Sequence, residues 1–295
     1  MNVFTAAVAL YVALSAAAAP AQTPDVSVGA QYDSTHAYVA PADFDRFVAS
    51  FVATFGGKSS QKATVTVTPT SSETYSQVAL TPAGTVSAFG FLTPIPFPFG
   101  SERCGYMVTD LDSAVAAART DGASILVAPF PDPIGRDALI QWPGGIVMQL
   151  YVHFARPVYP ALATVPENRF YLAPEDADAF LRDFEAFAHA TVVSDVSNAS
   201  GAEIGRRGYS YRRVDLESGF GNVRAIVSDG HLPYPYGRER TGYRVANVDD
   251  TLRDATASGA TILVPAFASG GRTSAMVEFP GGYVAEVHSE ITRTA

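Results

Sequence analysis

Cysteine is almost absent from this 295-residue chain, which contains only Cys104. A single thiol cannot form an intrachain disulfide, and it cannot supply a zinc site built on thiolates. Histidine is also scarce, with five residues, so a metal site built from several imidazoles has few candidates. The folded state must therefore be stabilised by its hydrophobic core.

Positively charged residues are also fewer than negatively charged ones. Lys and Arg number 20 against 29 Asp and Glu, which gives a net charge of −9, and the basic residues are scattered. Such a chain lacks the basic surface that binds a nucleic-acid backbone. A hydrophobic fraction of 47% with 24 Gly and 20 Pro is typical of a well-cored, loop-rich globular protein. We expect a small-molecule ligand and no nucleic acid as its partner, and the oligomeric state stays open.

The first 21 residues resemble a secretory signal peptide. An apolar run is followed by small residues that end in Ala19-Pro20-Ala21, which predicts cleavage before Gln22. A membrane-spanning helix is the alternative, but the run is short for a bilayer core. We therefore expect a secreted or periplasmic protein without stable membrane insertion after cleavage.

An internal repeat is the strongest signal in the rest of the chain. The segment 94–106, PIPFPFGSERCGY, matches the segment 231–243, HLPYPYGRERTGY, at seven of thirteen positions. Average residue usage would give roughly one identity by chance. The match continues downstream, with GASILVAPF against GATILVPAF and a Pro-Gly-Gly in each copy. The repeat predicts two tandem domains, at 30–156 and 165–292.

Each copy subdivides into two units with the order βαβββ. In copy one, apolar side chains recur at helical spacing over 42–55, and a second helix is predicted to open at Asp110. Strand-like segments lie at 35–39, 62–68, 75–92, 106–109, 124–128, 138–142 and 147–153. The sequence therefore predicts an α+β fold with four βαβββ modules.

The second half of each copy resembles the vicinal oxygen chelate superfamily, which includes glyoxalases, bleomycin-resistance proteins and extradiol dioxygenases. Three motifs carry the resemblance: VTDLD and VANVD before the helix, Gly-Ala before the second strand, and Gly-Arg with Pro-Gly-Gly before the last strand. The resemblance implies paired modules that curl into a half-barrel around a concave site. It is weak for activity, because this fold serves many reactions and also non-catalytic drug binding.

The resemblance also implies where a metal ion would be held, on the first and last strands of the modules. The first-strand positions, seven residues before the residue that opens each helix, hold His36, Arg103, Arg169 and Arg240. The last-strand positions hold Gln149 and Glu286. An arginine keeps its charge and repels a cation. We therefore expect no metal or other cofactor, although a divalent ion held by a rearranged set of residues stays an alternative.

Copy one offers the better candidate site. Strand alternation predicts one cavity lined by His36 and Tyr38 as catalytic residues and by the substrate-binding residues Arg103, Gln149, Tyr151 and His153. In this interpretation the histidine moves a proton and the arginine anchors an anion. The alternative is structural, with Arg103 paired to Glu102 or another carboxylate and His36 a satisfied cavity residue.

Copy two carries opposite charges at Arg240 and Glu286, two candidate binding residues in positions that should adjoin. The simplest interpretation is an ion pair that fills a degenerate pocket. An acidic ligand there, or Glu286 as a base, is the alternative.

Three functions stay open from the sequence. The first is a glyoxalase-like, metal-independent lyase or isomerase acting on a small oxygenated anion in copy one. The second is a non-catalytic protein that binds a small, partly aromatic molecule in the same cleft. The third is a metal-dependent lyase or dioxygenase.

Overall fold

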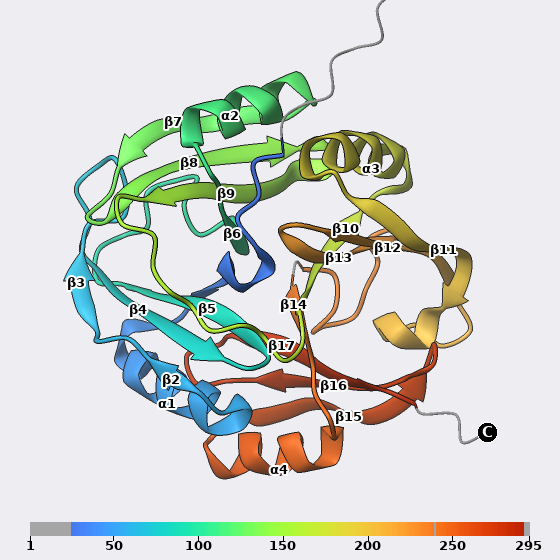
Figure 1. Ribbon diagram of the computed structural model, residues 1–295. Helices are drawn as coiled ribbons and strands as arrows, with labels where there is room; N and C mark the ends of the chain where they lie inside the picture. The colour runs from blue at the N-terminus through green and yellow to red at the C-terminus, as the bar shows by residue number, and fades with distance from the viewer. Residues whose placement is uncertain (1–24, 239, 292–295) are drawn as a thin grey trace, which may run out of the picture.

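The computed structural model describes residues 25–238 and 240–291 (Figure 1). The predicted signal peptide, residues 1–21, lies outside this part. Within the described ranges, none of the helices is both long enough and apolar enough to cross a bilayer.

Copy one forms one curved sheet of nine strands with two helices on it. The strand order is β2-β4-β5-β1-β6-β9-β8-β7, and β3 pairs with β4. The elements are β1 (Asp33–Tyr38), α1 (Phe44–Phe55), β2 (Lys58–Ser59), β3 (Ala63–Val65), β4 (Thr74–Thr81), β5 (Gly84–Phe91), β6 (Cys104–Met107), α2 (Leu111–Thr120), β7 (Ser124–Pro131), β8 (Gly135–Trp142) and β9 (Ile146–His153).

Copy two repeats this arrangement in an eight-stranded sheet, in the order β11-β12-β13-β10-β14-β17-β16-β15. Its elements are β10 (Glu167–Leu172), α3 (Pro174–Ala188), β11 (Thr191–Ser200), β12 (Ser210–Ser218), β13 (Gly221–Val227), β14 (Arg240–Arg244), α4 (Val248–Ala257), β15 (Thr261–Ser269), β16 (Arg272–Glu278) and β17 (Val284–Glu290). The predicted α+β architecture of tandem βαβββ modules is confirmed.

The two modules of a copy join through their first strands. In copy one, β1 pairs with β6 in antiparallel fashion and with β5 in parallel, and β6 pairs in parallel with β9. Copy two joins in the same way through β10, β14, β13 and β17. Side chains that share a face of β1, β5, β6 and β9 therefore converge on the concave side of one sheet.

Local sequence explains where the helices begin. Helix α2 starts after Asp110, whose side chain accepts a hydrogen bond of 2.8 Å from the backbone N–H of Ser113. Helix α4 starts after Asn247, which caps Asp250 in the same way at 3.0 Å. Both caps satisfy backbone donors that have no partner inside the helix. Equivalent residues of the repeat therefore cap the second helix of each copy.

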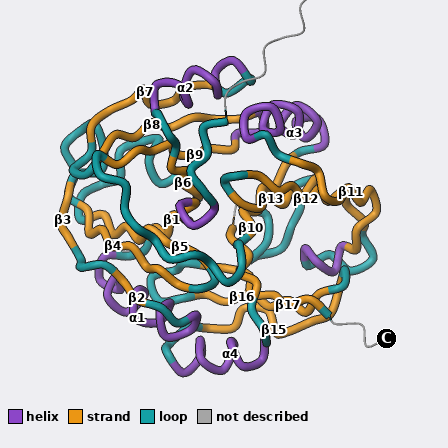
Figure 2. The backbone as a smooth tube through the Cα atoms, in the orientation of Figure 1, coloured by secondary structure: helices purple, strands orange, loops and turns teal. Residues whose placement is uncertain are grey.

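The hydrophobic cores do not follow the boundary between the copies. Helices α2 and α3 lie at one end of the molecule and α1 and α4 at the other, with the strands between them (Figures 1 and 2). One core joins the second module of copy one to the first module of copy two, with Trp142 5.3 Å from Phe187 between ring centroids. The other joins the remaining two modules, where Phe51 lies 5.3 Å from Phe279. Each core is thus shared by both copies.

Candidate functional site

The concave face of the copy-one sheet encloses a cavity of about 90 Å³. Five of the residues predicted to share a site line it: His36, Tyr38, Gln149, Tyr151 and His153. Apolar side chains complete the lining, among them Val67, Val78, Phe89, Phe99 and Ile134. The strand alternation read from the sequence therefore places these five side chains correctly.

His36 and Glu102 form the polar wall of this cavity. The His36 side chain is 2% exposed, Glu102 is fully buried, and 3.8 Å separate His36 Nδ1 from Glu102 Oε1. Tyr38 donates a short hydrogen bond to the same carboxylate oxygen. Burial, and then the Glu102 charge, raise the pKa of the Tyr38 hydroxyl well above its usual range, so this phenol stays a donor.

Two atoms of this wall are buried without a hydrogen-bond partner. They are His36 Nδ1 and Glu102 Oε2. Leaving a buried polar atom unpaired costs about 1–3 kcal/mol, and more for a charged group. Such atoms are uncommon in folded proteins and point to a partner that the folded chain does not itself supply.

The opposite wall carries Asp137, Gln149 and His153. Burial, and then the charge of Asp132, raise the pKa of Asp137 well above its usual range, while Gln149 hydrogen-bonds it and works against the rise. Burial lowers the pKa of His153. The cavity therefore combines a carboxyl group whose pKa is raised and an imidazole whose pKa is lowered with the His36–Glu102 pair.

Arg103 does not line this cavity, contrary to the sequence-based prediction. It precedes β6 and lines a different cavity, between the two copies, with its guanidinium carbon 5.9 Å from the centroid of the Tyr38 ring. The alternative interpretation, an ion pair between Arg103 and Glu102, is also wrong for the described structure, because Glu102 faces Tyr38 and His36. The copy-one cavity has acidic and neutral polar groups but no arginine in its lining.

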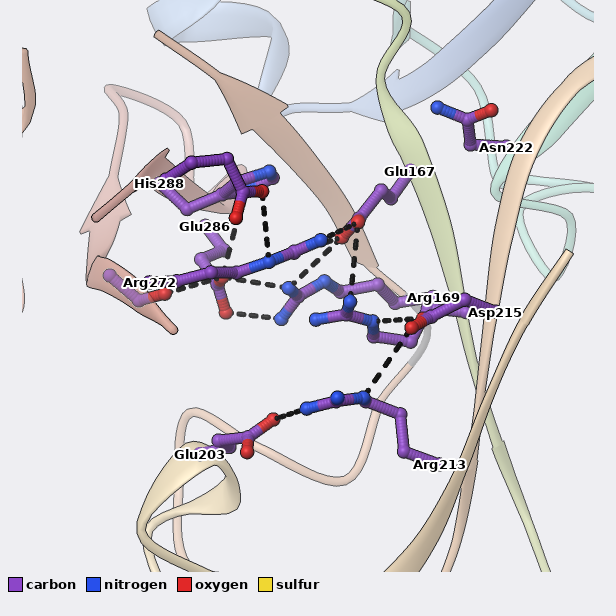
Figure 3. A network of polar contacts seen from close by, with 12 residues as sticks. Glu167, Arg169, Glu203, Arg213, Asp215, Asn222, Arg272, Glu286 and His288 are labelled. Carbon is purple, nitrogen blue, oxygen red and sulfur yellow. Dashed lines mark hydrogen bonds and ion pairs between the residues drawn. The ribbon is translucent and has the colours of Figure 1, made fainter. Parts of the chain in front are cut away.

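Glu286 of copy two pairs with Arg169, which corrects the predicted Arg240–Glu286 pair. The Arg169 guanidinium makes two hydrogen bonds to Glu286, one of them 2.7 Å long, and Ser274 donates a third at 3.0 Å (Figure 3). Arg240 instead donates to the backbone carbonyl of Pro235 at 2.8 Å. The prediction fails because Gly242 of β14 has no side chain, and the Arg169 side chain occupies the space that a side chain would take there.

The remaining charges of copy two extend this network (Figure 3). The ion pairs are Arg272–Glu167 at 2.6 Å, Arg224–Asp215 at 2.6 Å and Arg213–Glu203 at 2.6 Å. Burial opposes the charge of Arg169, but Glu286 and Glu167 outweigh it and raise its pKa. The space enclosed beside Arg169 and Glu286 is only about 10 Å³, whereas Glu167, Arg272 and His288 of the same network line a separate cavity of about 220 Å³. The expectation that copy two fills its own pocket with ion pairs is therefore met by Arg169 rather than by Arg240.

Solved structures of three proteins share this arrangement at low sequence identity. A triple mutant of 4-hydroxymandelate synthase from Streptomyces coelicolor has a TM-score of 0.57 and 14% identity, covering 89% of this chain and 93% of its own. The Mn(II)-bound glyoxalase from Novosphingobium aromaticivorans has a TM-score of 0.54 and 15% identity, covering 90% and 83%. A xylose isomerase-like TIM barrel/4-hydroxyphenylpyruvate dioxygenase fusion protein has a TM-score of 0.53 and 12% identity, covering 93% and 51%. This chain has the vicinal oxygen chelate fold.

No protein-family model matches the sequence, and no curated protein is similar enough to match. The assignment of the fold therefore rests on similarity of three-dimensional structure. At 12–15% identity, this similarity supports the architecture and nothing about activity.

The metal site of vicinal oxygen chelate proteins needs three or four donors around one ion, as the resemblance implies. Within 25–238 and 240–291, no three His, Cys, Asp or Glu side chains are grouped closely enough to hold one. At the copy-one cavity, His36 and Glu102 lie 3.8 Å apart, and the strand positions beside them hold Ser87, Gly105 and Gln149. Two such donors do not fit a divalent site with three protein ligands.

Sequence reasoning missed Glu102 and Asp137 as residues of this vicinal oxygen chelate cavity. Glu102 lies before β6 begins, so strand alternation assigns it no face. Asp137 lies on β8 directly opposite Tyr151 of β9 in the register. A charged residue beside the apolar run Ala138-Leu139-Ile140 is the signal that would have found it.

Proposed function

We propose that this chain is a glyoxalase-like enzyme that moves a proton within a small, oxygenated, uncharged molecule in the copy-one cavity, as a lyase or isomerase. The observation that carries the proposal is the His36–Glu102 pair, buried at one cavity with an unpartnered atom on each residue. At the equivalent first-strand position of copy two, Arg169 is paired with Glu286 and Glu167, and a guanidinium does not act as a base. Copy two also has a buried His288–Glu286 pair, but burial lowers the pKa of His288 to about 3 and Arg169 occupies the carboxylate, so copy one is the better candidate.

The charges of the lining favour an uncharged substrate over the anion expected from the sequence. Glu102, Asp132 and Asp137 line the cavity, and Arg103 does not. A carboxylate substrate would be repelled by the carboxylates of Glu102 and Asp132. The apolar residues of the wall suit a substrate that also has a hydrocarbon part.

The proposed chemistry is a proton transfer next to a carbonyl group. The His36 imidazole takes the proton from carbon, and the adjacent Glu102 carboxylate stabilises the imidazolium that forms. The electron pair moves onto the carbonyl oxygen, where Asp137, in the protonated form that burial favours, donates a hydrogen bond. His36 then returns the proton to the former carbonyl carbon, and the hydroxyl proton of the adjacent carbon passes to the oxygen that took up the electron pair. The hydroxyl and carbonyl groups thereby exchange places, and no external reactant is needed.

Deuterium exchange tests this proposal directly. The full chain is incubated in D₂O with dihydroxyacetone or 2-hydroxyacetophenone, and loss of the carbon-bound proton is followed by NMR. We expect protein-dependent exchange that falls by at least about a hundredfold in His36→Gln and in Glu102→Gln, the usual contribution of a positioned acid–base group. His231→Gln is the matched control, because that histidine is 87% exposed and far from the cavity lining.

Other results would redirect the assignment. Tight binding of either compound without exchange would support the non-catalytic binding alternative. Exchange that appears only when a divalent ion is added, and in stoichiometric proportion to it, would support the metal-dependent alternative. Equal exchange in wild type and His36→Gln would remove His36 from the mechanism.

A further inference from the structure

A second cavity, of about 320 Å³, lies where the two copies meet. Copy one contributes Arg103, and copy two contributes Arg238 and Arg240, with the hydroxyl-bearing residues Tyr283 and Thr241 between them. Arg103 and Arg240 occupy equivalent positions of the repeat, in SERCGY and RERTGY. The junction of the copies thus brings one arginine from each copy into the same space.

None of these three arginines has an ion pair within the described part of the chain, in which Glu239 is not included. Arg103 contacts the face of the Tyr38 ring, and Arg240 donates to the Pro235 carbonyl. In the copy-two network, by contrast, Arg169, Arg224 and Arg272 each meet at least one carboxylate. Arg103 and Arg240 are half-buried and Arg238 is exposed, so their guanidiniums stay accessible to a ligand, whereas carboxylates occupy the arginines of the copy-two network.

The proximity of these three arginines is electrostatically unfavourable in the folded chain. Burial lowers the pKa of Arg240, and the charge of Arg238 lowers it further. Tyr283 experiences the field of both Arg240 and Arg103, which oppose the burial that raises the pKa of its hydroxyl to about 12. The three cations line one cavity and repel one another, and an anion between them relieves the repulsion.

We propose that this inter-copy cavity is a binding site for a small organic polyanion, a di- or tricarboxylate or a phosphate ester, held by Arg103, Arg238 and Arg240. Guanidinium groups bind carboxylate and phosphate oxygens with paired, charge-assisted hydrogen bonds. The cavity volume falls in the range that holds an organic ligand, and it is larger than a bare inorganic ion needs. The hydroxyl groups of Tyr283 and Thr241 supply further hydrogen bonds to such a ligand.

This proposal does not rest on the proton-transfer function. The two cavities adjoin at His36 and Tyr38, but their chemistry is opposite, acidic in copy one and basic at the junction. An anion would be repelled from the first and attracted by the second.

Titration calorimetry on the full chain tests the site, with citrate and glycerol 3-phosphate as probes at an ionic strength of about 20 mM, where screening is weak. We expect one molecule of at least one probe to bind per chain. We expect Arg103→Gln and Arg240→Gln each to weaken that binding about tenfold or more. Preference for citrate would identify a carboxylate ligand, and preference for glycerol 3-phosphate a phosphate ester.

The matched control is Arg119→Gln, which removes an exposed arginine on α2 that lines neither cavity. It should bind as the wild type does. Arg238→Gln is the variant that protects the test against misfolding, because Arg238 is an exposed residue of a turn, and it should weaken binding too. Absence of saturable binding by both probes would overturn the proposal, and so would unchanged affinity in the folded arginine variants.

Discussion

The two copies differ in the residue at one position of the candidate site. It holds His36 in copy one and Arg169 in copy two, on equivalent first strands. An imidazole can be buried in its neutral form, whereas a guanidinium keeps its charge. Burying Arg169 therefore requires carboxylates, and Glu286 and Glu167 supply them. This difference in ionisation explains why the space beside His36 stays open in copy one, whereas ion pairs almost fill the space beside Arg169 in copy two.

The buried histidine of copy two predicts an acid-sensitive stability. Burial, together with the charges of Arg169 and Arg272, lowers the pKa of His288 to about 3. The unfolded chain has a histidine pKa of about 6.5, so below that pH the unfolded state binds a proton that the folded state does not. Stability is therefore lost as the pH falls below about 6.5, by up to about 1.4 kcal/mol per pH unit for this residue.

Urea unfolding between pH 7.5 and pH 5 checks this prediction. We expect His288→Gln to lose less stability over that range than the wild type does. The exposed His231→Gln should follow the wild-type slope. Glu167 of the network does not obscure the comparison, because its pKa is lowered well below its usual range. A slope unaffected by His288→Gln would mean that another group accounts for the acid sensitivity.

At the scale of single elements, the alternation of side chains along a strand predicts which residues face the same cavity. His36, Tyr38, Gln149, Tyr151 and His153 share one cavity because each lies within a strand whose register continues from a recognisable repeat. Arg103 and Glu102 precede the first residue of β6, where alternation no longer determines the direction of a side chain. The loop between β5 and β6 therefore places Glu102 at the copy-one cavity and Arg103 at the inter-copy cavity, and its conformation could not be predicted from the order of the residues.

Gly105 predicts a tight coupling between β1 and β6. A Cβ atom at this position would lie 2.5 Å from His36 Nε2, so an alanine and the imidazole cannot occupy their present places together. We expect Gly105→Ala to destabilise the protein by about 1–3 kcal/mol through overpacking. In a His36→Ala background the same change should cost much less, because the space is then vacant. Chemical unfolding of the four proteins of this double-mutant cycle measures the coupling.

Additive effects in that cycle would contradict the prediction. They would indicate that the strands shift apart locally and that His36 keeps its place. Copy two offers an independent comparison, because a Cβ at Gly242 would lie 2.9 Å from Arg169 Nε, the same relation with a different side chain.

At the scale of the whole molecule, sequence units and packing units differ. The repeat divides the chain into copy one and copy two, and each copy supplies one complete sheet. The two largest hydrophobic cores instead join the second module of copy one to the first of copy two, and the outer modules to each other. Smaller clusters lie within a single copy, around Tyr211 and Met276 in copy two and around Tyr32 and Tyr151 in copy one. A domain that folds alone normally has its main core to itself, and here both main cores are shared between the copies.

We therefore expect the copies not to fold separately when the chain is divided between residues 160 and 161. Trp142, the only tryptophan, reports on this directly, because it is 1% exposed and packs on Phe184 and Phe187 of the other copy. The fragment 25–160 should show red-shifted tryptophan fluorescence and no cooperative thermal transition. Addition of the tryptophan-free fragment 161–295 should shift the emission to the blue and restore a cooperative transition. A fragment 25–160 that already emits and unfolds like the full chain would show that copy one closes its own core.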